Sequence, residues 1–291
     1  MKTFAFFLLS FSAVFAFAGT DAKTTAPEPE GAKLWDVTAK TSYVFSSDFD
    51  SGDRRLGSQD ALGLEFRAVR RIPIQGDWYF KIGAQYDRFD FGSSGAHVPA
   101  HLQSVAAVLA IEYLSRGRTG FIFQITPGAY FENDVNAGAF DIPIYAGMAF
   151  RLTDNFFLVG GFTAGLLREY PILPALGFVW NVSEQWKINM LVPRPGIIYT
   201  PSEKWSFWAG GELVGGAFRT GDSDEPELRN AVVSYREIRA GVAATWKPCP
   251  GAELVLGTGW TFERQFDYHR AGRTFTTEGA PYLNFSVQCS F

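Results

Sequence analysis

Three histidines are the first residues in this chain that could do chemistry, because imidazole serves as a general base and as a metal ligand. They are His97, His101 and His269. His97 and His101 are four residues apart, and Asp267 lies two residues before His269. A hydrolase or acyltransferase needs a nucleophile, a base and an orienting group within hydrogen-bond reach. These spacings match no such motif, so we expect solvated loop histidines, no metal site, no cofactor and no enzymatic activity.

Charged residues at alternate positions are the second candidate group. Every second side chain of a strand points to the same face, and a charge in a membrane barrel must point away from lipid. By this alternation a barrel interior would receive Asp36, Glu65, Asp87, Glu112, Glu132, Asp141, Glu212, Glu237 and Glu263, together with Lys40, Arg67, Lys81 and Arg239. An open interior with this excess of acids would weakly favour cations. A narrow interior would instead pair the charges across strands, and both interpretations stay open.

The pattern that would position these residues has a period of two, which is typical of a strand with two different faces. It begins near residue 34 and continues to the end of the chain, where Phe285 and Val287 alternate with Ser286 and Gln288. Aromatic residues make up 16% of the chain and charged residues 19%. After the N-terminal segment no apolar run reaches the ~18 residues of a membrane-spanning helix. Any insertion into a membrane would therefore use strands.

The connections between these segments alternate in length, as they do in transmembrane β-barrels. Short links such as residues 153–155 and 182–184 take turns with longer polar ones such as 92–101 and 267–278. We therefore predict an all-β protein, an antiparallel transmembrane β-barrel of about 14 strands. Prolines divide residues 172–200 into pieces shorter than a spanning strand. If these pieces form a low hairpin or fold inward, the barrel has about 12 strands instead.

Six of the eight tryptophans lie where a strand begins or ends beside a short link. They are Trp35, Trp78, Trp180, Trp186, Trp205 and Trp246. Amphipathic rings prefer the headgroup level of a membrane. This spacing predicts an aromatic girdle at the interface on the side of the short links.

The N-terminus predicts export from the cell interior. Residues 1–18 hold Lys2, an apolar run and a small-x-small site ending at Ala18, which is the pattern of a cleaved signal peptide. Residues 19–33 mix proline with charge and predict a flexible periplasmic leader, and residues 34–291 form the barrel. In an oxidising compartment Cys249 and Cys289 are able to form a disulfide, with two unlinked thiols as the alternative.

The C-terminal segment, with Phe285, Val287 and the terminal Phe291, resembles the recognition strand that the barrel-assembly machinery reads in bacterial outer-membrane proteins. Residues 193–208 (PRPGIIYTPSEKWSFW) resemble uncharacterised, porin-like families of outer-membrane barrels built around a Tyr-x-Pro-Ser-x-x-Trp turn. The resemblance implies a location in the bacterial outer membrane, contact with its lipid and assembly by that machinery. It implies no established activity.

The net charge and the predicted number of strands limit the classes of function that are possible. The formal net charge of −4 and the absence of a Lys/Arg run exclude nucleic acid as a partner. About 12 to 14 strands leave room for a channel unless something plugs it. The leading hypothesis is therefore a passive or substrate-selective channel for small solutes, with a mildly acidic lumen. The alternatives are a structural or surface protein with a closed lumen and, less favoured, an outer-membrane enzyme that acts on lipid or peptide.

Overall fold

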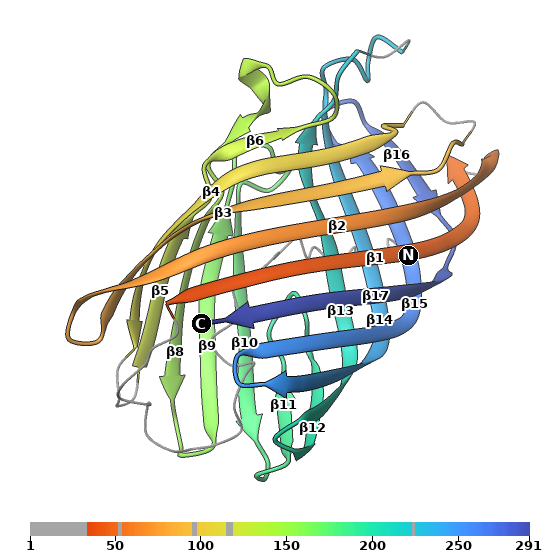
Figure 1. The fold of residues 1–291 in the computed structure, drawn as a ribbon. Coiled ribbons are helices and arrows are strands. Elements are labelled where there is room, and N and C mark those ends of the chain that lie inside the picture. Colours follow the sequence, from red (N-terminus) through yellow and green to blue (C-terminus); the bar gives the residue numbers. More distant parts are fainter. Residues whose placement is uncertain (1–33, 52–53, 95–97, 115–118, 223–224) are drawn as a thin grey trace.

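The computed structural model describes residues 34–51, 54–94, 98–114, 119–222 and 225–291 of the chain. The expected signal peptide (residues 1–18), the expected leader (19–33) and His97 lie outside the described residues. The described part is a single antiparallel sheet that closes on itself (Figure 1). Within it, no helix is long and apolar enough to cross a membrane.

The sheet contains 17 strand segments. In chain order they are β1 (Trp35–Ser51), β2 (Arg54–Gln75), β3 (Trp78–Phe91), β4 (His101–Leu114), β5 (Thr119–Ile125), β6 (Gly128–Phe131), β7 (Phe140–Asp141), β8 (Ile144–Arg151), β9 (Phe156–Ala164), β10 (Ile172–Asn181), β11 (Trp186–Asn189), β12 (Gly196–Ser202), β13 (Trp205–Arg219), β14 (Val232–Cys249), β15 (Ala252–Tyr268), β16 (Arg273–Thr277) and β17 (Ala280–Ser290). A short 3-10 helix, η1 (Ala137–Ala139), precedes β7.

Three of the strands that run from rim to rim are interrupted, so the 17 segments make a closed barrel of 14 strands. Pro127 separates β5 from β6, and Pro143 separates β7 from β8. Proline cannot donate to a ladder, which explains both breaks. Glu278 and Gly279 separate β16 from β17. The prediction of an antiparallel barrel of about 14 strands is confirmed.

The barrel closes where the last strand meets the first (Figure 1). β17 pairs with β1 from Ser290 opposite Asp36 to Tyr282 opposite Val44. The amide N–H of Trp35 donates to the carbonyl oxygen of Phe291 at 2.8 Å. The rim that holds these termini also carries the short turns, and we call it the tight-turn rim. We call the opposite one the long-loop rim.

The proline-rich region between β10 and β13 forms short strands and also folds inward. β11 and β12 have 4 and 7 residues, yet they pair with each other and with β10 and β13. They therefore belong to the sheet, which is why the barrel has 14 strands rather than 12. The turn between them enters the interior, where Leu191 packs against Val159 and Val179.

The two cysteines carry free thiols in the structure. Ala252 is opposite Cys249 in one ladder and opposite Cys289 in the next, so it stands between them. Of the two outcomes that the sequence permits, the structure has the unlinked one.

Candidate functional site

The outer face of the barrel is apolar and has tryptophan along one rim. The six tryptophans of the predicted girdle are 37 to 47% exposed and lie at strand ends beside the tight-turn rim. Phe285 and Phe291 also point outward. The placement is the one that an interface girdle and an outward-facing terminal strand require. The headgroup contact itself stays a prediction.

The interior has one half that is mainly charged and one that is mainly apolar. In the lower interior, near the tight-turn rim, Glu112 is 1% exposed and lies between two cations. Its carboxylate oxygens are 3.0 Å from Lys81 Nζ and 3.0 Å from Arg71 Nε. The sequence predicted Glu112 and Lys81 for this face but not Arg71, although Arg71 continues the alternation that starts at Arg67.

Further ion pairs and hydrogen bonds connect polar side chains of the interior. Lys40 Nζ donates to Glu212 Oε1 at 2.7 Å, between β1 and β13. Arg239 Nε donates to Glu237 Oε2 at 2.7 Å along β14. Arg67 Nη2 donates to the side chain of Gln124 at 3.2 Å. Contacts such as Lys40 with Glu212 connect strands that are not neighbours, so alternation alone could not have paired them.

Other predicted residues are held by polar neighbours around the interior. Ser290 Oγ donates to Asp36 at 2.6 Å. The amide N–H of Gly221 donates to Glu132 at 2.8 Å, which ties two loops of the long-loop rim together. Glu65 lies on β2 two positions from Arg67, so the two side chains share the inner face.

Glu263 is a correction to the sequence prediction, because it lies on the outer face. A bulge in β15 sets Glu263 opposite Ile238 and Thr261 opposite Arg239, so Phe262 is the extra residue. The alternation therefore changes phase at this point. Glu263 forms its ion pair with Arg236, and Arg264 turns inward instead.

Several bases in the interior were missed by the sequence analysis. They are Arg71, Arg168, Lys187, Arg194 and Arg264. Arg264 was hidden by the bulge and Arg194 by its place in a turn, where its guanidinium stacks 4.3 Å from the ring centre of Trp208. Among the described residues, these five bases reduce the excess of acids that the sequence predicted for the interior.

In the upper interior, near the long-loop rim, aromatic residues from distant strands meet. The ring centres of Phe89 and Tyr235 are 5.0 Å apart, and those of Phe91 and Phe266 are 4.8 Å apart. Phe89 also lies 6.2 Å from Phe218. Phe89 and Phe91 come from β3, and their partners come from β13, β14 and β15. We call Phe89, Phe91, Phe218, Tyr235 and Phe266 the aromatic septum.

The septum is part of a larger cluster of buried apolar side chains. Leu102 and Leu228 belong to it, and both are almost fully buried. Leu228 lies in the connection between β13 and β14, so this long loop folds onto the septum. The sequence signal was present, since Phe89, Phe91 and Tyr235 share the parity of the predicted interior charges.

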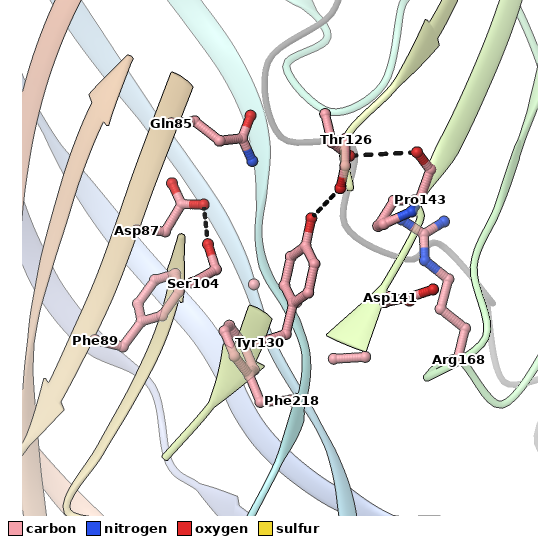
Figure 2. Close-up of a pocket in the computed structure, with 13 residues that line it drawn as sticks. Gln85, Asp87, Phe89, Ser104, Thr126, Tyr130, Asp141, Pro143, Arg168 and Phe218 are labelled. Atoms are coloured by element: carbon pink, nitrogen blue, oxygen red, sulfur yellow. Dashed lines mark hydrogen bonds between the residues drawn. The ribbon is translucent and has the colours of Figure 1, made fainter. Parts of the chain in front are cut away.

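A cavity of about 90 Å³ lies directly below the septum, lined by Phe89 and Phe218 together with polar groups. Figure 2 shows Gln85, Asp87 and Ser104 on one side of it and Asp141 and Arg168 on the other. The remaining lining residues are Thr126, Tyr130, Pro143, Gly215, Gly216 and Ala217.

Hydrogen bonds hold the polar lining of the cavity in place. Ser104 Oγ donates to Asp87 at 2.8 Å, and Tyr130 donates to the carbonyl of Thr126 at 2.9 Å (Figure 2). Asp141 accepts from the backbone N–H of Leu166 at 2.9 Å, which draws the β9–β10 loop towards the interior. The cavity is smaller than the ~300 to 1,000 Å³ of a site for a drug-sized ligand. It has room for a few water molecules of ~30 Å³ each.

The described histidines lie apart from this cavity. His101 begins β4 at the long-loop rim, and His269 lies in the turn between β15 and β16. Burial, and then the charge of Arg270, lower the pKa of His269, which favours the neutral ring. Among the described residues no group of His, Cys, Asp and Glu could hold a metal ion.

Comparison with solved structures finds similar barrels. The COG4313 outer membrane channel from Pseudomonas putida F1 is 10% identical with a TM-score of 0.49, and the match covers 91% of this chain and 100% of that chain. A FadL homologue of Pseudomonas aeruginosa is 11% identical with a TM-score of 0.44, over 89% and 90% of the two chains. LpxR from Salmonella typhimurium is 10% identical with a TM-score of 0.42, over 88% and 100%. A likeness at this level concerns the fold and carries no function from one chain to another.

The family is shown by sequence. No curated protein matches the chain. Residues 76–291 match the model of a family described as a domain of unknown function, DUF6268. This match confirms the expected membership of an uncharacterised family of barrels. Because it covers most of the chain, the protein belongs to the DUF6268 family.

Proposed function

We propose that this protein is an outer-membrane channel that selects small solutes, rather than an open diffusion pore. The aromatic septum carries the proposal, because rings from β3 meet rings from β14 and β15 across the upper lumen, with Leu228 of the β13–β14 loop packed on them. A barrel of about 14 strands is otherwise wide enough for an aqueous channel. Side chains can rotate aside for a solute that fits, whereas hydrated ions would lose their water in an apolar layer.

The outer-membrane location rests on three features. The outer face is apolar, tryptophans line one rim, and residues 1–18 have the pattern of an export signal. The terminal Phe291 would be the signal read by the barrel-assembly machinery. Lipid and this machinery are thus the proposed partners, beside the solute itself.

The charge selectivity of the channel is expected to be weak. The acids of the interior stand beside bases such as Arg71 and Lys40, so little net charge is left to concentrate cations. This replaces the mildly acidic lumen that the sequence suggested. It leaves the polarity of the septum, rather than the sign of a charge, to select the solute.

The test is single-channel conductance of the refolded protein in a planar bilayer. Wild type is expected to pass few ions, while the double variant Phe89→Ala/Phe91→Ala, which removes one side of the septum, conducts steadily. The matched control Phe207→Ala/Phe285→Ala removes two rings from the outer face and is expected to stay as quiet as wild type. A folded septum variant that remains silent would refute the proposal.

A structural barrel with a permanently closed lumen is the second candidate. It is favoured by the almost complete burial of Leu102 and Leu228 against the septum. The two candidates differ in the uptake of small neutral solutes by cells that make the wild-type protein. A channel raises the rate of uptake above that of cells with an empty vector, and a closed structural barrel leaves it unchanged.

A further inference from the structure

The wall of the barrel has a break in its hydrogen-bond ladder between β10 and β13. Residues 172–178 of β10 pair with β9, but on the other side the strand meets β11 only at residues 179–181, apart from one bond to Phe178. β13 meets β12 only up to Gly210, followed by single bonds from Gly211 and Leu213. The next contact on that side is Arg219 with Phe131 of β6. In the part of the chain that the structure describes, residues 172–177 and 214–218 have no strand partner across the break.

The directions of the backbone N–H groups at the break follow from the alternation of N–H groups along a strand. The N–H groups of Gly211 and Leu213 point to the β12 side, so those of Gly215 and Ala217 point into the break. On β10, Pro174 has no N–H at all, as expected of a residue at a free edge. Gly215 has a φ of +138°, a backbone conformation that residues with a side chain rarely adopt. Pro174 and Gly215 are therefore residue types that suit an unpaired strand edge.

An open edge inside a membrane needs a polar neighbour. Unpaired N–H and C=O groups are tolerated at membrane depth only where they face protein or a water-filled cavity. The cavity below the septum supplies this, because Gly215, Gly216 and Ala217 of β13 line it. Arg168 of the adjoining loop lines it too (Figure 2). The break and the cavity therefore belong together.

The outer rim of the break is apolar. Leu176 and Ile172 of β10 and Leu166 of the preceding loop are 75%, 66% and 71% exposed. These are three of the four most exposed large hydrophobic side chains in the described part of the chain. Hydrocarbon would meet the break directly at this rim.

The two halves of the interior decide which way an apolar solute leaves the cavity. Above the cavity is the apolar septum, and below it lie the charges of Arg67, Lys81 and Glu112. An apolar molecule that passes the septum would displace water from these charges if it continued downward, which is unfavourable. The rim of the break offers it an apolar surface instead.

We propose that the break between β10 and β13 is a lateral port through which a small, uncharged, mainly apolar molecule passes between the cavity and the membrane. This inference rests on the proposed channel function. The molecule would carry at most one or two hydrogen-bonding groups, for which Gln85 and Ser104 provide partners in the cavity.

The test is uptake of N-phenyl-1-naphthylamine, an uncharged dye that fluoresces once it reaches an apolar environment. The dye is larger than the cavity of about 90 Å³, so its passage requires the side chains of the septum to rotate aside. Cells that make wild type are expected to take it up several-fold faster than cells with an empty vector. Ala217→Trp adds a large outward side chain beside the break and is expected to return the rate to that of the vector. Ala244→Trp adds the same ring to the outer face of β14 where β13 and β15 both pair with it, and is expected to keep the wild-type rate.

The outcomes separate the port from the channel. If wild type takes up the dye and Ala217→Trp does so equally well, the port is wrong and the channel stands. If wild type does not take up the dye, the port is wrong, and the conductance of the septum variant decides the channel independently. Should Ala217→Trp fail to fold, backbone hydrogen exchange of wild type in lipid nanodiscs decides. The amides of Gly215 and Ala217 are expected to exchange much faster than those of the fully paired residues 240–243, and equal protection would overturn the proposal.

Discussion

At the scale of the residue, Glu112 shows how strongly a buried charge depends on its partners. Removing one member of a buried pair leaves an uncompensated charge and costs about 3 to 5 kcal/mol. Glu112→Ala would leave both Lys81 and Arg71 without this carboxylate. We expect the free energy of unfolding, measured with urea in lipid vesicles, to fall by about this amount.

The control for Glu112 is an exposed pair. Asp154 is 2.9 Å from Arg151 but its side chain is 98% exposed, so Asp154→Ala is expected to change stability by at most about 1 kcal/mol. Glu112→Gln keeps the shape and loses the charge, and should lose most of the stability that Glu112→Ala loses. Equal effects for Glu112→Ala and Asp154→Ala would show that water screens the interior charges.

The alternation of residues predicted most of the side chains that face the interior, but not which of them pair with one another. Lys40, Lys81, Glu112 and Glu212 were all assigned to the inner face from the period of two alone, and they lie there. That Lys40 meets Glu212 depends on the curvature of the closed barrel, which no local pattern contains. The alternation likewise places the septum residues on the inner face, but it does not predict which of their rings come into contact.

At the scale of the element, the bulge in β15 sets the faces of everything beyond it. Phe262 and Glu263 both point outward, so deleting Phe262 would restore a regular alternation with Thr261 and Arg264 still inside. We expect the Phe262 deletion to fold, as judged by the heat-modifiable mobility of the folded barrel on gels. Deleting Thr258 from the regular part of the strand would exchange the two faces between that site and the bulge, and should prevent folding.

The bulge at Phe262 also explains why the sequence prediction placed Glu263 on the wrong face of this strand. Alternation gives the correct face only until an extra residue changes its phase, and a single sequence does not mark where that happens. Glu263 was misplaced and Arg264 overlooked for this one reason. A Phe262 deletion that cannot fold, beside a Thr258 deletion that can, would contradict the role of the bulge.

At the scale of the whole molecule, closure joins the first strand to the last, and Phe291 stands at that seam. Its backbone exchanges two hydrogen bonds with Trp35, at 2.8 and 3.0 Å, while its side chain is 68% exposed. Phe291→Ala keeps both backbone bonds, so the free energy of unfolding of the purified barrel is expected to change by less than about 1 kcal/mol.

Assembly in the cell is expected to respond differently, because the assembly machinery would read the side chain before the barrel closes. Phe291→Ala should lower the fraction of protein that reaches the membrane as folded barrel, measured by fractionation and heat-modifiable mobility. Phe207→Ala, which removes a 44% exposed ring from the outer face of β13, is the control and should assemble like wild type. If Phe291→Ala assembled normally, the ring would have no role in recognition. If it instead lost much stability after purification, its role would be in holding the seam closed.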